Sequence, residues 1–138
     1  EMLESLASSL TARNARDEDI TKLTSINERF KEASLLKNVK ECIEEDCYFH
    51  ELLYKFSNND KLVHLMIQSN LHLLSIAESS PNFFEISHQY YQHHDNIIKA
   101  ILARNEVQAE HAMRDHIHYS KEQILAALSS ATTYQISV

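Results

Sequence analysis

Nine histidines in a chain of 138 residues are the feature of this sequence with the most chemical potential. An imidazole can ligate a metal, carry a proton or change charge near neutral pH. Three of these rings, His50, His94 and His116, fall on the apolar faces of predicted helices. A polar ring on a core face costs on the order of a few kcal/mol unless it finds a partner. Three such rings in one small domain favour a partner that they share.

The other six histidines have a plainer interpretation. His88 belongs to a Glu85-x-x-His88 step, but this step occurs once, whereas ferritin-like di-iron proteins need it twice together with two further inward glutamates. The remaining five are expected at surface or half-buried positions: His64, His72, His93, His111 and His118. The sequence therefore argues against a di-iron centre and leaves one candidate cluster.

Spacing predicts where the three core histidines meet. Asp46 lies four residues before His50, so the two side chains share one face of a helix. His94 and His116 are each 11 residues from Asn105, where a tight turn is predicted. In an antiparallel hairpin both rings then lie at one level, about 16 Å from the turn. An Asp-x-x-x-His step alone is more commonly a helical ion pair, but packing of the third helix in that groove would bring all four side chains together.

One carboxylate and three imidazoles suit zinc, nickel, manganese or iron, and suit calcium or magnesium poorly. A divalent ion held by Asp46, His50, His94 and His116 keeps a net charge of about +1 and attracts a small anion. Four protein ligands in an octahedron leave two adjacent positions, which a carboxylate, hydroxy acid or keto acid can chelate. The same site could hold an activated water and be catalytic. A third interpretation is a structural bundle whose histidines pair only with nearby polar groups.

Composition determines the fold class that must position these residues. The chain has no glycine and one proline, Pro81, which argues against Gly-rich phosphate loops, β-sandwiches and doubly wound sheets. With 43% apolar residues, we expect one all-α domain over residues 1–138, an antiparallel bundle of about six helices with the metal site in its central cavity. The net charge of −7 argues against nucleic-acid binding by this part alone. Without a membrane-spanning run, and with Cys42 and Cys47 as reduced thiols, we expect a cytoplasmic location.

Periodicity and capping residues predict the individual helices. Asn59 is a good N-cap for the fourth helix, and Pro81 is expected to open the fifth. The fourth helix is apolar nearly all round, so we expect it to be the central one. The tail from Ser129 is expected to fray. The predicted helices cover residues 2–14, 18–35, 38–57, 60–78, 81–104 and 107–129.

Several stretches together resemble the FCD domain, the C-terminal effector-binding domain of the FadR-like branch of GntR-type transcriptional regulators. Leu10 to Ile20 is similar to the family's "LAA-x-RAT-x-EDL" stretch, and Asp46 to Leu53 carries its "D-x-x-FH-x-x-L" motif. Ser57 to Asn59 stands where the family has "SGN". His94 to His116 follows its "H-x-x-I-x-x-AI-x-x-RD…A…M-x-x-H" pattern. The resemblance covers nearly the whole chain.

The resemblance implies a helical bundle whose metal ligands are Asp46, His50, His94 and His116 and whose effector is a small carboxylate metabolite. It also implies a homodimer that binds operator DNA through an N-terminal winged helix-turn-helix, which is absent from this chain. Family members often carry an arginine on the fourth helix that clamps the effector, and Asn70 occupies its place here. We therefore assign Asn70 and Asn59 as effector contacts. Further departures from the family pattern are Asn58 for glycine, Arg16 for threonine and Asn14 for arginine.

The function predicted from the sequence is ligand sensing rather than catalysis. We expect the effector domain of a bacterial transcriptional regulator that binds a divalent metal, zinc first, and a small hydroxy or keto acid of the lactate or pyruvate type. The alternative is a metal-dependent enzyme acting on a small carboxylate.

Overall fold

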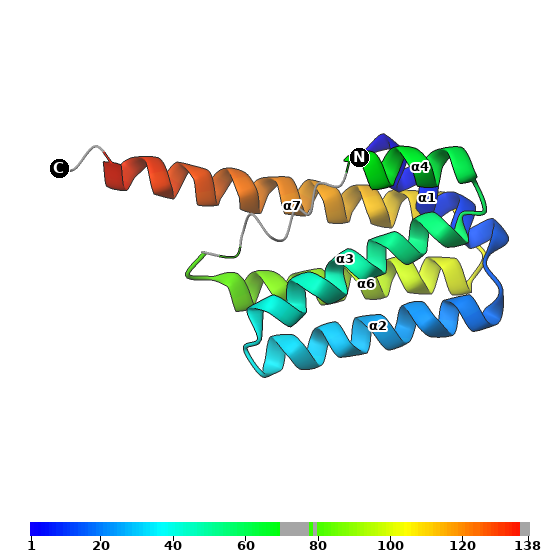
Figure 1. Cartoon of the computed structure of the whole chain (residues 1–138), viewed down its shortest axis with the longest axis horizontal. Helices are drawn as coiled ribbons and strands as arrows, with labels where there is room; N and C mark the ends of the chain where they lie inside the picture. Colours follow the sequence, from blue (N-terminus) through cyan, green and yellow to red (C-terminus); the bar gives the residue numbers. More distant parts are fainter. Residues whose placement is uncertain (70–77, 79, 136–138) are drawn as a thin grey trace.

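The computed structural model describes residues 1–69, 78 and 80–135 of the chain. These residues form helices and no strand, and short turns join most of the helices into an antiparallel bundle (Figure 1). The all-α prediction is thereby confirmed. The six helices of this part of the chain are α1 (Met2–Asn14), α2 (Asp17–Leu35), α3 (Val39–Phe56), α4 (Asp60–Ser69), α6 (Phe83–Leu102) and α7 (Glu106–Gln135).

Three helices end in the left-handed conformation that glycine usually occupies, although the chain has no glycine. After α2, the backbone N–H of Asn38 donates to the carbonyl of Ala33 at 2.9 Å, and after α6 that of Asn105 donates to Ala100 at 3.0 Å. These six-residue bonds are typical of Schellman motifs and close each turn tightly. The residues with positive φ are Lys37 (56°), Asn58 (54°) and Arg104 (55°).

Asparagine side chains accept backbone N–H groups at the starts of α3, α4 and α7, and the start of α2 is capped in another way. The Asn59 side chain accepts the Leu62 backbone N–H at 3.1 Å, which confirms it as the N-cap of α4. At the start of α2, Arg16 occupies the position where the family has threonine. The Asp19 carboxylate accepts the Arg16 backbone N–H there at 3.1 Å, so the cap is made from inside the helix.

The core consists of two clusters of buried apolar side chains, one toward each end of the bundle. Helices α2, α3 and α6 contribute to both clusters, and α7 packs against α1 and α6 along its first half. The first cluster includes Leu23, Leu53, Ile97, Ile101 and Met113. The second includes Phe30, Cys42, Phe83, Ile86 and Tyr90. On α6, His94 lies between Tyr90 of the second cluster and Ile97 of the first, so polar residues separate the two clusters.

Helix α1 turns small residues toward the core and leaves two of its leucines largely exposed. Leu3 and Leu6 are 41% and 45% exposed. Its inward face carries small side chains, which allow α1 to lie close to α3, α6 and α7. The buried residues of this face are Ser5, Ala7, Ser8, Thr11 and Ala12. Close approach of the backbones thus decides the orientation of α1, rather than the size of its apolar residues.

The prediction that the fourth helix is central is wrong for its described part. Helix α4 lies at the edge of the bundle, against α3 and α1 (Figure 1). It buries Leu62 and Met66, while Leu65 and Ile67 are 51% and 58% exposed. In its described part, α4 therefore buries only one of its apolar sides, and the other apolar residues face away from the bundle.

The bounds of α6 and α7 also differ from prediction. Helix α6 begins at Phe83, because Pro81 and Asn82 lie in the preceding turn. Helix α7 continues through Ser129 to Gln135, since no glycine or proline interrupts it. Cys42 is buried, Cys47 is half-buried, and no disulfide joins them. None of the helices in the described ranges is both long and apolar enough to cross a membrane.

Candidate metal centre

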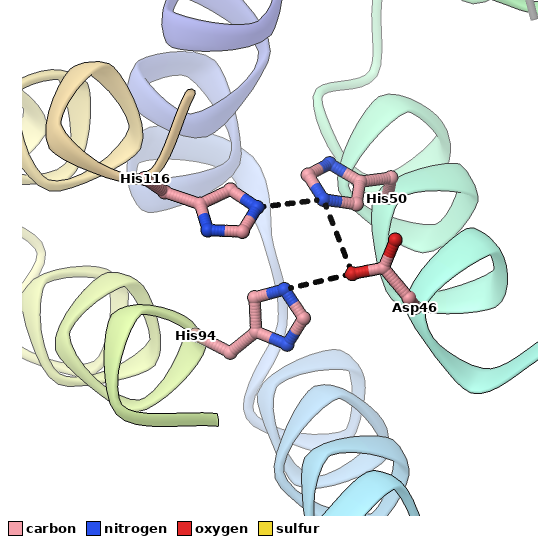
Figure 2. A group of neighbouring side chains, drawn as sticks. All are labelled: Asp46, His50, His94 and His116. Atoms are coloured by element: carbon pink, nitrogen blue, oxygen red, sulfur yellow. Dashed lines mark hydrogen bonds and ion pairs between the residues drawn. The ribbon is translucent and has the colours of Figure 1, made fainter. Parts of the chain in front are cut away.

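The four side chains singled out by spacing converge in the middle of the bundle. Asp46 and His50 come from successive turns of α3, His94 from α6 and His116 from α7 (Figure 2). Each offers one ligand atom, and these atoms all lie within 4.8 Å of one another. The hairpin argument is confirmed, because the rings of His94 and His116 have centroids 4.8 Å apart.

The facing atoms of the group are three imidazole nitrogens and one carboxylate oxygen. His50 Nε2 lies 3.2 Å from His116 Nε2 and 4.0 Å from Asp46 Oδ1. His94 Nε2 lies 3.3 Å from the same Asp46 oxygen. A cation with ligand bonds of 2.0–2.2 Å needs its donors roughly 3–4 Å apart. These separations are of that size.

The centre is shielded from water. Asp46, His94 and His116 are buried, and His50 is largely covered. Burial lowers the pKa of His94, and it lowers that of His116 well below the usual range. Both rings are therefore neutral at pH 7, which is the form that ligates a metal.

His50 differs from the other two histidines because a second carboxylate faces its outer nitrogen. Its Nδ1 lies 3.3 Å from Oε2 of Glu4 on α1, and the other Glu4 oxygen accepts the Tyr54 hydroxyl proton at 2.5 Å. Burial opposes charge on the His50 ring, yet the Glu4 and Asp46 carboxylates raise its pKa. Burial likewise opposes charge on Glu4, yet His50 and Tyr54 lower the pKa of that carboxyl.

Buried neighbours also orient His94. Its Nδ1 lies 3.2 Å from the side-chain oxygen of Asn27, whose amide nitrogen donates to the Tyr91 carbonyl. The Nδ1 proton therefore points to Asn27 and leaves the Nε2 lone pair toward Asp46. The Phe49 ring stacks on His94 with centroids 4.0 Å apart and planes 18° apart. The tautomer and the ring plane are both held.

The residues fit a bound divalent transition metal on the evidence of their unsatisfied atoms. Asp46 Oδ1 and His94 Nε2 are buried, and among the described residues neither makes a well-aligned hydrogen bond. Leaving such atoms unpaired in a core is costly. A cation among three imidazoles and one carboxylate would satisfy both, and this donor set suits zinc and its neighbours better than calcium or magnesium.

The other predicted positions among the described residues are not part of this four-residue group. Glu85 and His88 are both exposed. Asn59 is half-buried at the start of α4, and Asn70 lies outside the described residues, as does His72. The remaining histidines with a plain interpretation are exposed or half-buried, as expected: His64, His93, His111 and His118.

Sequence reasoning missed Glu4 and Asn27, the two polar partners of the ligand rings. Each is far from its histidine along the chain, and neither belongs to a metal-ligand spacing pattern. The sequence offered one signal, for Asn27 only. Asn27 lies between Leu23 and Phe30 on the core-facing side of its helix, where a polar residue is unexpected.

The fold is an all-α bundle with four potential metal ligands gathered in its core. The sequence model of the FCD domain family matches residues 1–119. The chain therefore belongs to the FCD domain family, whose members are the ligand-sensing parts of GntR-type regulators.

Two solved structures agree with this assignment. A Streptococcus agalactiae GntR is similar with a TM-score of 0.73 and 26% identity, over 88% of this chain and 54% of that one. The E. coli protein McbR/YncC has the same fold with a TM-score of 0.78 and 17% identity, over 94% of this chain and 61% of that one. This chain thus spans little more than half the length of these proteins. No curated protein matches it.

Proposed function

We propose that this chain is the effector-binding domain of a transcriptional regulator and that it senses a small organic acid through a bound divalent metal. Asp46, His50, His94 and His116 would hold the metal, with zinc as the first candidate and nickel, manganese or iron as alternatives. The observation that carries the proposal is the meeting of these four donors in a buried position, where Oδ1 of Asp46 and Nε2 of His94 are left unsatisfied.

The charge of the site supports an acidic ligand. A divalent ion with one aspartate and three neutral imidazoles carries a net charge of about +1 away from water. No arginine lies between Arg29 and Arg104 in the sequence, so the metal would be the main cation available to a carboxylate in this part of the fold. A hydroxy or keto acid of the lactate or pyruvate type, which offers two adjacent oxygens, matches two open coordination positions.

The role in the whole regulator follows from the family. We propose that the domain acts as a homodimer, in a cytoplasmic protein, and modulates an upstream winged helix-turn-helix that binds operator DNA. Effector binding would shift the balance between two packings of the helices, and its influence is limited to its difference in affinity for them. This regulatory role requires no turnover of the bound acid.

The test combines metal analysis with ligand screening. Protein purified without nickel resin should contain about one metal ion per chain, and hydroxy or keto acids should raise its melting temperature only while the metal is present. His116→Ala should lose both the metal and the response to acids. His111→Ala, which changes an exposed ring of the same helix, should lose neither. Absence of metal from the wild type would overturn the proposal, and turnover of any acid would favour the enzyme alternative.

The proposed contact of Asn59 with the effector can be tested separately. Asn59→Ser keeps an N-cap for α4, so the fold should be retained. If the amide contacts the acid, the substitution should weaken the binding of the acid without changing the metal content. Unchanged affinity would remove Asn59 from the site.

A further inference from the structure

The strongest feature outside the four donors is the half-buried carboxylate of Glu4. Glu4 lies in the first turn of α1, and its side chain is only 17% exposed. Its two oxygens contact two side chains of α3 that lie one turn apart, His50 Nδ1 at 3.3 Å and the Tyr54 hydroxyl at 2.5 Å. The carboxylate therefore lies between α1 and α3, with both of its oxygens paired.

The geometry excludes Glu4 from the donor set itself. It faces the Nδ1 edge of the His50 ring, whereas the opposite nitrogen, Nε2, faces His116 and Asp46. The imidazole therefore stands between the carboxylate and the centre. A carboxylate on Nδ1 accepts the proton there, which fixes the tautomer with its lone pair on Nε2 and makes that lone pair more basic.

The other two histidines lack an equivalent anionic partner. His94 has the neutral amide of Asn27 on its Nδ1. The Nδ1 atom of His116 is buried without a hydrogen-bond partner among the described residues. His50 is also the least buried of the three rings, so its orientation depends most on a specific contact.

We propose that Glu4 is a positioning residue for the metal centre, which holds His50 for ligation and thereby ties the first turn of α1 to the bound ion. Tyr54 completes this arrangement by fixing the second Glu4 oxygen. The inference rests on the proposed metal site and adds a contact from α1 to the ligand His50, whereas the four donors come only from α3, α6 and α7. Metal binding would therefore act directly on the position of α1.

The test measures zinc affinity by competition with a chromophoric chelator at one fixed pH. Glu4→Ala should weaken zinc binding about 10–100-fold, the usual range for loss of such an outer partner. Glu4→Gln keeps a hydrogen-bond acceptor and should lose less, and Tyr54→Phe should lose least. Glu32→Gln, at an exposed position of α2, is the matched control and should bind as the wild type does.

A second readout separates positioning from simple support of the fold. Two-dimensional ¹⁵N NMR of zinc-loaded wild type should show His50 protonated on Nδ1 and ligated through Nε2, and zinc should slow amide exchange in α1. In Glu4→Gln the protection of α1 by zinc should fall although the metal-free melting temperature stays near that of Glu32→Gln. Wild-type affinity in both Glu4 variants would overturn the positioning role alone, whereas failure of the wild type to bind zinc would overturn the metal site as well.

Discussion

Acidification of the metal-free domain provides a direct test of the buried histidines. His94 and His116 have folded-state pKa values below their usual range, because burial disfavours the charged rings. In the unfolded chain both rings accept protons as the pH falls through about 6.5. The unfolded state then binds more protons than the native state, so the free energy of unfolding must fall below this pH. The stability is present above pH 6.5 and is lost on the acid side.

The magnitude follows from proton linkage. Between pH 6.5 and 5.5, a ring that stays neutral in the native state and has an unfolded pKa of about 6.5 costs about 1 kcal/mol. His116, whose pKa is lowered furthest, contributes about this amount, and His94 contributes in the same direction. His50 acts in the opposite direction because its pKa is raised. A ring already protonated in the native state offsets only a fraction of this loss over the same interval. The net loss is on the order of 1–2 kcal/mol, or roughly 3–8 °C in melting temperature for a domain of this size.

The assay is urea denaturation of chelator-treated protein at pH 6.5 and pH 5.5. His116→Gln removes one buried titrating ring, so about 1 kcal/mol of the pH-dependent loss should disappear even if the variant is less stable at both pH values. His111→Gln, at an exposed position of α7, should keep the full dependence. A free energy of unfolding that is constant or rises between pH 6.5 and 5.5 would refute the reasoning from buried neutral rings.

Two further outcomes are expected. Free zinc at 100 times its dissociation constant should stabilise the domain by about 2.7 kcal/mol, roughly 10 °C in melting temperature, and a chelator should reverse this; an unchanged melt would contradict a site that binds only the folded state. Lys37→Gly should raise the free energy of unfolding by about 0.5–1 kcal/mol, because Lys37 has φ of 56° and glycine adopts the left-handed region without steric cost. A lower urea midpoint for Lys37→Gly would show that the lysine contributes more than its backbone costs.

The sequence predicted that these four side chains meet because two geometric rules act over short distances. The Asp46–His50 step depends only on the period of one helix, and the level of His94 with His116 depends only on equal distances from the turn at Asn105. The prediction also assumed that α3 packs in the groove between α6 and α7, and this is wrong for the described helices, because α3 packs against α2, α1 and α4. The side chains of α3 nevertheless reach α6 and α7 across the core, where Phe49 stacks on His94 and His50 lies beside His116.

What the sequence could not give are features set by tertiary packing. The apolar residues of α4 suggested a central helix, yet Leu65 and Ile67 face solvent in a single chain. Hydropathy cannot distinguish burial inside a bundle from burial against a second molecule. The contact between Glu4 and His50 joins residues 46 positions apart on different helices, so no local period reports it.

The turn between α6 and α7, where an arginine takes the place usual for glycine, determines how two of the metal-centre histidines are aligned. The level of His94 with His116 is set by the register of the turn between α6 and α7, and one inserted residue would rotate His116 by about 100° away from the group. Arg104 occupies the left-handed position of that turn with φ of 55°. Its guanidinium donates to the Ala15 carbonyl and lies 2.8 Å from Asp17, which joins the turn to the start of α2.

A glycine at position 104 would relieve the backbone but remove this link. The Lys37 side chain makes a weaker interaction, a cation–π contact in which its nitrogen lies 5.9 Å from the centroid of the Phe84 ring. The turn at Lys37 also does not determine the position of any proposed metal ligand. The same backbone conformation therefore has different consequences at the two positions. Relief of backbone strain should dominate at Lys37, whereas at Arg104 the side chain contributes to the register on which the four donors depend.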